Sequence, residues 1–219
     1  MIKGMIFDLD GTTLNTLEDL HASFNLMMKE FGYGNFSLDE VRMGVGHGLK
    51  ALINNLGPRD LDQETKDKMA KCFREKYSGN YMIRTKPYPG IKKMLEELQA
   101  KGIKLAAHSN KDDIYVKNLM AENFPQISFI ECRGAIEGIA LKPDPEAVYL
   151  ILEKMGLNKE EVVYVGDSDT DIETAKNAGL RSIGCLWGFR DYETLKTAGA
   201  DYIVKGPEEI IDLVKEEKQ

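Results

Sequence analysis

Short apolar runs alternate with helix-length amphipathic stretches through the second half of the chain, and this alternation constrains the fold more than any other feature. The runs are rich in β-branched residues, and each is followed by a turn or a polar residue, as buried strands are. We expect strands at 5–7, 103–107, 127–130, 162–165, 182–186 and 202–204. We expect helices near 90–101, 112–122, 145–155, 170–178, 191–197 and 207–217. The pattern predicts an α/β fold, a parallel sheet with helices on both faces.

Residues 16–84 break this rhythm, because apolar residues recur there at helical spacing and no convincing strand is present. The turn-rich stretch Lys86-Pro87-Tyr88-Pro89-Gly90 marks the far boundary of this region. We therefore expect a Rossmann-like, three-layer core formed by residues 1–15 and 85–219. An inserted all-helical cap domain of residues 16–84 would interrupt this core directly after its first strand, and could open and close over it.

Composition narrows the classes of function. The 219 residues include 29 Lys and Arg and 36 Asp and Glu, so the net charge of −7 disfavours nucleic acid as a partner. The three cysteines are far apart and show no CxxC spacing, which predicts free thiols in a reducing cytosol. The first apolar run is too short for a signal peptide, and no uncharged stretch approaches the ~18 residues of a membrane helix. We expect a cytoplasmic protein that binds neither nucleic acid nor membrane.

Polar side chains follow three of the expected strands where packing does not explain them: Asp8-Leu9-Asp10-Gly11-Thr12, Ser109-Asn110, and Gly166-Asp167 through Asp171. In an open parallel sheet, ligands bind outside the carboxyl ends of the strands, so we expect these residues to share one pocket. Asp10-Gly11-Thr12 alone is equally well interpreted as an ordinary turn. That interpretation does not account for Asp8, a second carboxylate at the end of an apolar strand, where an ionised group needs a partner or a metal.

Asp167, Asp169 and Asp171 alternate as the first ligands of a helix-loop-helix calcium site do. Such a loop needs Gly at its sixth position and Glu at its twelfth, where this chain has Ile172 and Ala178. Acidic residues also favour a helix N-terminus, which suffices to explain Asp169. For Asp167 the better explanation is a hard cation shared with Asp8. Mg²⁺ suits such a site because it takes oxygen ligands, keeps waters and bridges to phosphate.

Lys142 lies in Leu141-Lys142-Pro143-Asp144-Pro145, where two prolines stiffen the loop before a helix. A lone loop lysine is usually a solvated surface residue. The rigid setting, together with the need for a cation beside an anionic substrate in an acidic protein, favours a role for Lys142 in the site.

Gly44, Gly46 and Gly48 bracket Val45 and His47 in the helical region. They follow no strand, so a dinucleotide-binding loop is a weak interpretation. A tight turn and a loop that faces the substrate both fit this segment. In the second case His47, flanked by Gly46 and Gly48, is the residue most able to contact an anion.

Four elements in this order resemble the motifs of the haloacid dehalogenase superfamily of phosphatases, in its phosphoglycolate phosphatase-like branch with a helical cap: Asp8-Leu9-Asp10-Gly11-Thr12, Ser109-Asn110, Lys142-Pro143-Asp144-Pro145, and Gly166-Asp167 followed by Asp171. The resemblance covers essentially the whole chain. It implies that Asp8 is the nucleophile and Asp10 the general acid and later base. Mg²⁺ would be held by the Asp8 carboxylate, the Asp10 backbone carbonyl and Asp167, with Asp171 acting through water or from behind the ligands. The residues expected to bind phosphate are Asp8, Gly11, Thr12, Ser109, Asn110 and Lys142.

The resemblance further implies hydrolysis of a small phosphorylated metabolite, with phosphoglycolate as the leading substrate, by a monomer or weak homodimer. An inorganic pyrophosphatase and a β-phosphoglucomutase-like phosphotransferase use the same kind of core and are alternatives. A non-catalytic domain that binds phosphorylated ligands would be expected to have lost the nucleophile or a metal ligand, whereas this chain has all of them.

Overall fold

The structure of the chain is a computed structural model that describes residues 1–216. The chain divides into two compact units. One combines Met1–Leu14 with the chain from Pro87 onward, and the other is Asn15–Lys86. The short strands β2 (Leu14–Asn15) and β3 (Lys86–Pro87) pair with each other where the chain passes from one unit to the other.

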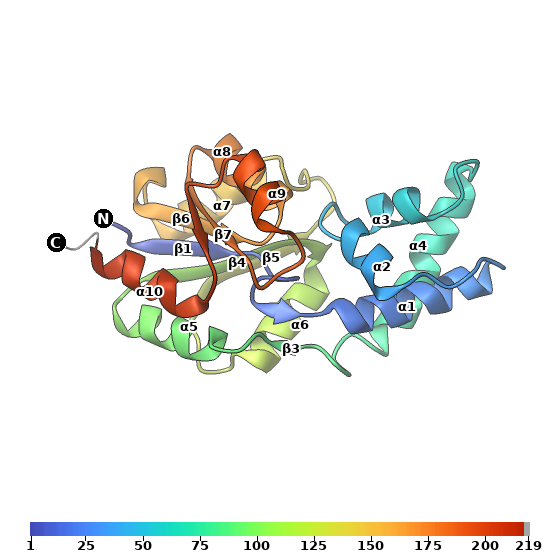
Figure 1. The fold of residues 1–219 in the computed structure, drawn as a ribbon, viewed down its shortest axis with the longest axis horizontal. Helices are drawn as coiled ribbons and strands as arrows, with labels where there is room; N and C mark the ends of the chain where they lie inside the picture. Colours follow the sequence, from blue (N-terminus) through green and yellow to red (C-terminus); the bar gives the residue numbers. More distant parts are fainter. Residues whose placement is uncertain (217–219) are drawn as a thin grey trace. The chain divides into compact units, whose positions relative to one another are not determined.

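The larger unit is built on a six-stranded parallel sheet with the order β5-β4-β1-β6-β7-β8 (Figure 1). Its strands are β1 (Gly4–Phe7), β4 (Lys104–Asp112), β5 (Phe129–Ala135), β6 (Val162–Gly166), β7 (Arg181–Cys185) and β8 (Tyr202–Val204). The first strand lies in the middle, so that the chain builds outward through β4 and β5 on one side and through β6 to β8 on the other. This is the switch point where such sheets bind ligands.

Helices cover both faces of this sheet, as the alternating pattern predicts. Figure 1 shows α7 and α8 on one face and α5 and α10 on the other. The elements between the strands are α5 (Ile91–Ala100), α6 (Asp113–Asn123), α7 (Glu146–Met155), the 3₁₀ turn η1 (Lys159–Glu161), α8 (Asp169–Ala178) and α9 (Tyr192–Ala198), and α10 (Pro207–Glu216) follows β8. Because both faces are covered, β1 and β6 are buried along their whole length. The predicted three-layer α/β core is confirmed.

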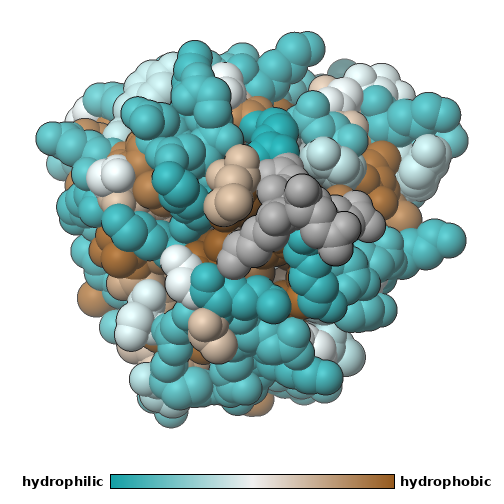
Figure 2. Space-filling view, turned by 90° about the vertical axis from the view of Figure 1, so that its left-hand side faces the viewer, coloured by the Kyte–Doolittle hydropathy of each residue, from teal (hydrophilic) through white to brown (hydrophobic). Residues whose placement is uncertain are grey.

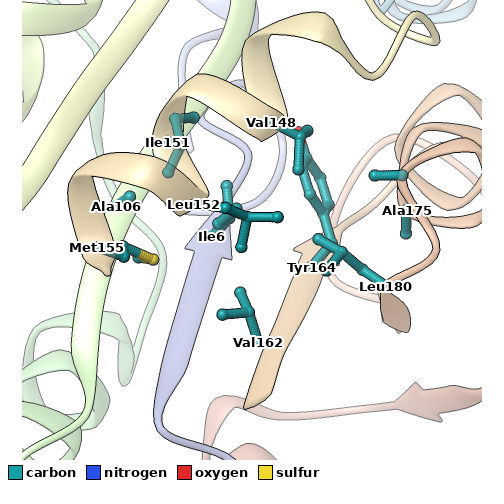
Figure 3. Close-up of a cluster of buried hydrophobic side chains, with 11 residues drawn as sticks. Ile6, Ala106, Val148, Ile151, Leu152, Met155, Val162, Tyr164, Ala175 and Leu180 are labelled. Carbon is teal, nitrogen blue, oxygen red and sulfur yellow. The ribbon is translucent and has the colours of Figure 1, made fainter. Parts of the chain in front are cut away.

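An apolar cluster fixes α7 and α8 to the central strands (Figure 3). Its members come from β1, β4, β6, the two helices and the turn after α8: Ile6, Ala106, Val148, Ile151, Leu152, Met155, Val162, Tyr164, Ala175, Ala178 and Leu180. Tyr164 is the large member with a polar end, and it is fully buried. A buried tyrosine hydroxyl needs a hydrogen-bond partner, and this one lies close to the candidate site.

The smaller unit is helical, as predicted for this part of the chain. It contains α1 (Leu17–Glu30), α2 (Leu38–Gly44), α3 (Leu49–Leu56) and α4 (Gln63–Ser78). Ser37 and Glu40 form a capping box at the start of α2, and Asp62 accepts from the Thr65 N–H at the start of α4. The buried carboxylate of Asp19 accepts from the backbone N–H groups of Arg84 and Thr85, which ties the end of the unit to α1.

The predicted strand ends differ from the observed ones by more than one residue at two strands, β4 and β5. The strand expected at 103–107 extends to Asp112, so Ser109 and Asn110 lie within β4 and not after it. The strand expected at 127–130 is β5, which begins at Phe129 and extends to Ala135. The reason is that β4 and β5 continue to pair beyond their apolar residues, up to Asp112 with Ala135.

The part of the surface seen in Figure 2 is the side that holds the start of the chain in Figure 1. Most residues on it are hydrophilic, and the hydrophobic ones appear as separate areas between them. Among residues 1–216, no helix has the length and apolar character needed to cross a membrane.

Candidate active site

Asp8 directly follows β1, the central strand of the sheet. Its backbone N–H continues the pairing with β6 by donating to the Val165 carbonyl at 2.8 Å. The following residues turn sharply at Gly11, which has a φ of 90°, and the N–H groups of Thr12, Thr13 and Leu14 converge on the Leu9 carbonyl. The pairing and this compact turn fix the backbone that carries the Asp8 carboxylate at the carboxyl edge of the sheet.

Lys142 bridges two of the carboxylates. Its ammonium group donates to Asp8 Oδ1 and to Asp171 Oδ1, both at 2.7 Å, and its side chain is only 3% exposed. Asn110 holds the backbone of Lys142 by a reciprocal pair of hydrogen bonds, accepting from the Lys142 N–H at 2.8 Å and donating to its carbonyl at 3.1 Å. Lys142 lies in a loop, where lysines are usually solvated, but its side chain is buried in the site.

Asp167 follows β6 and is held on two sides. Thr12 donates its hydroxyl to Asp167 Oδ1 at 2.8 Å, and the Phe189 N–H donates to Oδ2 at 2.7 Å. Trp187 in turn donates its ring N–H to the Thr12 carbonyl at 2.9 Å. The loop after β7 thus fixes both Asp167 and the turn that bears Thr12.

Asp171 lies in the first turn of α8 and accepts from Ser168. The Ser168 hydroxyl and N–H donate to Asp171 Oδ2 at 2.6 Å and 3.1 Å, in the capping box that begins the helix. Its other oxygen meets Lys142, as described above. Asp169, the first residue of α8, places its Oδ1 3.7 Å from the Arg190 Nε. It is not part of the cluster of Asp8, Asp167 and Asp171.

Burial and the charge of Asp171 raise the pKa of two carboxylates of the site, Asp8 and Asp167. Burial, followed by the charge of Asp171, raises the pKa of Asp8 well above its ordinary value. The same two causes raise the pKa of Asp167 to about 7, although the hydrogen bonds from Phe189 and Thr12 oppose the shift. Burial alone would lower the pKa of Lys142, but Asp171 and Asp8 outweigh it and raise that pKa. Lys142 is therefore a permanent cation, while the carboxylates lack full charge compensation.

The donor set fits a divalent cation. Asp8, Asp167 and Asp171 each place a carboxylate oxygen within 4.8 Å of the other two, and all three residues are buried. Three carboxylates and one ammonium sum to −3 + 1 = −2, which a single Mg²⁺ balances. Hard oxygen ligands of this kind are those that Mg²⁺ prefers.

Asp10 and Ser109 lie next to this group on neighbouring segments. Asp10 Oδ2 forms an ion pair with Lys111 at 3.1 Å, and both side chains are largely buried. Ser109 is buried in β4, and its hydroxyl accepts from the Lys111 N–H at 3.3 Å. Lys111 is not among the site residues predicted from the sequence. The available signal was its position as a cation directly after Ser109-Asn110, near the end of a strand.

The glycines around the site leave no room for side chains. A Cβ on Gly11 would lie 2.3 Å from Asp167 Oδ2, and one on Gly188 would lie 2.2 Å from the Asp167 Cβ. A Cβ on Gly166 would lie 2.2 Å from that of Asp171. Sequence reasoning did not select Gly188, because nothing in its local pattern relates it to Asp167.

The predicted cap residues belong to the helical unit. Gly46 and Gly48 both have positive φ, at 126° and 84°, in the turn between α2 and α3 that contains His47. This geometry accounts for the glycines locally, because other residues rarely adopt it.

Buried carboxylates and a lysine at the switch point of a parallel sheet are the features of an enzyme active site in an α/β fold. Residues 5–185 match the family described as haloacid dehalogenase-like hydrolase, and the chain belongs to that family.

Relatives cover nearly the whole chain. The phosphoglycolate phosphatase of Aquifex aeolicus is 33% identical over 97% of this chain and 97% of its own. The phosphoglycolate phosphatase of Vibrio parahaemolyticus is 30% identical over 97% of this chain and 96% of its own. Among solved structures, a predicted phosphoglycolate phosphatase from Haemophilus somnus has a TM-score of 0.89 and 27% identity, covering 97% of this chain and 98% of that one.

Proposed function

We propose that this chain is a magnesium-dependent phosphatase that hydrolyses a small phosphate monoester through an aspartyl-phosphate on Asp8. The observation that carries the proposal is the group of Asp8, Asp167 and Asp171 with Lys142 between two of them. Phosphoglycolate is the leading substrate, because it is the substrate in the names of relatives that match along almost the whole chain.

Asp8 is the proposed nucleophile because its carboxylate lies at the strand end, next to a buried cation. One Asp8 oxygen forms a bond to phosphorus while the bond to the substrate's leaving oxygen breaks. Water then attacks phosphorus, the bond between Asp8 and phosphorus breaks, and inorganic phosphate leaves with the Asp8 carboxylate restored. Attack by one anion on another requires nearby positive charge, which Lys142 supplies from 2.7 Å.

Asp8, the Asp10 backbone carbonyl and Asp167 would hold Mg²⁺, with Asp171 acting through water or from behind the ligands. When bound, Mg²⁺ supplies charge neutralisation for the phosphoryl group and orients it for in-line transfer. Ser109, Asn110, Gly11 and Thr12 complete the proposed phosphate-binding site.

Asp10 is the proposed general acid and base. It protonates the leaving oxygen in the first step and removes a proton from water in the second. Its ion pair with Lys111 holds the carboxylate at the edge of the site and limits the positions it can take.

The helical unit is the proposed cap domain and the proposed source of selectivity, with His47, Gly46 and Gly48 as the substrate-facing turn. A cytoplasmic location is proposed because Cys72, Cys132 and Cys185 are all free thiols.

The test is a turnover assay with Mg²⁺ on phosphoglycolate, pyrophosphate and glucose 1-phosphate. We expect release of phosphate from phosphoglycolate, and Asp8→Asn lowers this turnover by a factor of at least about 10³. Acid-quenched protein should carry phosphate on Asp8 in the wild type and not in the variant. Asp169→Asn is the matched control, because Asp169 is a carboxylate of the same segment outside the buried group, and it should keep turnover. A variant at Asp8 that still turns over would exclude the covalent route, and preferred cleavage of pyrophosphate would change the substrate assignment.

A further inference from the structure

Tyr164 and His108 form a buried polar pair beneath Lys142. The Tyr164 hydroxyl lies 3.1 Å from His108 Nδ1, and the two rings meet edge to face. Both side chains are almost completely buried, at 0% and 2% exposed. Polar groups in the interior of a protein are retained at a cost in free energy, so a pair of this kind next to a functional site needs an explanation.

The strand register places this pair over the strand that leads to Asp8. Tyr164 on β6 and Ala106 on β4 both pair with Ile6 of β1. Residues two apart in a strand share a face, so His108 and Asp8 follow Ala106 and Ile6 on the same side of the sheet. The hydroxyl-to-imidazole contact therefore crosses from β4 to β6 over β1, and Figure 3 shows Tyr164 on this face among the apolar side chains.

The donors and acceptors of Lys142, Tyr164 and His108 are suited to form one directed chain. An ammonium group has three donors and no acceptor. Lys142 directs two of these donors to Asp8 and Asp171, which leaves a third, and its Nζ lies 6.0 Å from the centroid of the Tyr164 ring. If Tyr164 accepts from Lys142, its own proton must point to His108 Nδ1. His108 then has to be neutral with its proton on Nε2, and burial followed by the charges of Lys142 and Arg133 lowers its pKa well below the ordinary value.

We propose that Tyr164 and His108 are positioning residues for phosphoryl transfer, which together fix the ammonium group of Lys142 between Asp8 and Asp171. The inference rests on the phosphatase function proposed above. Without the third partner, the ammonium group keeps its charge but can rotate and shift away from the line between the two carboxylates. Misplacement of a positioned group by a fraction of an ångström lowers the rate of the chemical step more than it weakens binding.

The test compares substitutions that remove one polar atom at a time. Tyr164→Phe removes the hydroxyl and keeps the ring in the apolar cluster, and we expect kcat to fall about 10- to 100-fold with a much smaller change in KM. His108→Leu should lower kcat similarly, whereas His108→Asn should restore most of it, because the Asn oxygen can replace Nδ1 as the acceptor. Ser182→Ala is the matched control: this hydroxyl on β7 is equally buried but bonds Asp201, so its removal should lower stability without changing kcat.

The double variant Tyr164→Phe/His108→Leu shows whether the two residues act in series on Lys142 or lower kcat independently. Residues that act in series should give a double variant no slower than the slower single variant, whereas independent losses multiply. Multiplied losses, a His108→Asn variant as slow as His108→Leu, or a Tyr164→Phe variant with wild-type kcat would each overturn the inference. These outcomes leave the phosphatase function intact, since that function fails only if wild-type protein shows no turnover or if Asp8→Asn retains it.

Discussion

At the scale of single residues, the site depends on how closely the backbone approaches Asp167. Its carboxylate is enclosed by Thr12, by the Phe189 N–H and by Gly188. Any side chain on Gly188 would collide with Asp167. The carboxylate therefore has one available position, which suits a metal ligand because a preorganised ligand loses little freedom when the ion binds.

Gly188→Ala tests this enclosure. The added methyl group would meet the Asp167 Cβ at 2.2 Å and Oδ2 at 2.4 Å, so Asp167 must move. We expect stability to fall by about 1–3 kcal/mol, as in other overpacked interiors, and half-maximal activity to require several-fold more Mg²⁺. A magnesium titration of activity measures the second effect. Gly34→Ala is the control, because a Cβ there meets no atom within 4 Å. An unchanged magnesium midpoint in Gly188→Ala would contradict the ligand role of Asp167.

At the scale of elements, α8 connects helix capping to the site. Ser168 is the N-cap, and the same hydroxyl donates to Asp171 Oδ2, whose other oxygen meets Lys142. The start of the helix and the position of a charged site residue are therefore fixed by one hydroxyl group.

Ser168→Ala should lower the free energy of unfolding by about 1 kcal/mol, the usual contribution of an N-cap. It should also lower kcat, because Asp171 then keeps only the Ser168 N–H as a local donor. Ser37→Ala removes the corresponding hydroxyl from the capping box of α2, where no site residue is involved. Urea unfolding and kinetics of both variants provide the comparison. Equal kcat in the two variants would show that capping alone explains Ser168.

The sequence predicts the elements better than their ends. Apolar runs identify all six strands of the larger sheet, because buried parallel strands are nearly continuous apolar segments. The extension of β4 through Ser109 and Asn110 was not predicted, since it depends on pairing with a neighbouring strand and not on local residue type.

The carboxylates of the site could be selected from the sequence because acidic residues after apolar strands are hard to explain by packing. The residues that surround them could not. Lys111, Gly188 and Tyr164 follow ordinary local patterns, and Tyr164 in particular fits a buried strand position. Their roles arise from contacts between residues far apart in the chain, such as Tyr164 with His108.

At the scale of the whole molecule, the repulsion among the buried carboxylates lowers the stability of the folded chain, and bound Mg²⁺ would neutralise that charge. Asp167 has a pKa of about 7 in the metal-free folded state, against 3.8 as its ordinary value. Below pH of about 4 both states bind the proton, and the contribution of Asp167 to stability is fully present. As pH rises toward about 7, the unfolded chain loses this proton while the folded chain retains it, so the free energy of unfolding falls. The loss is complete above the folded pKa and is on the order of a few kcal/mol.

Asp167→Asn should remove this dependence. The amide can still accept from the Phe189 N–H, and the Thr12 hydroxyl can rotate to accept from the amide nitrogen, so both hydrogen-bond positions stay filled. In metal-free buffer we expect the variant to gain stability relative to the wild type between pH 5 and about 8, although it has lost activity.

Mg²⁺ should stabilise the wild type, and more strongly at the higher pH because it then binds ionised carboxylates without displacing protons. The variant should gain little from the metal. Urea unfolding at several pH values, with and without Mg²⁺, measures both effects. Parallel stability profiles for the two proteins would mean that Asp167 is not the group that couples stability to pH.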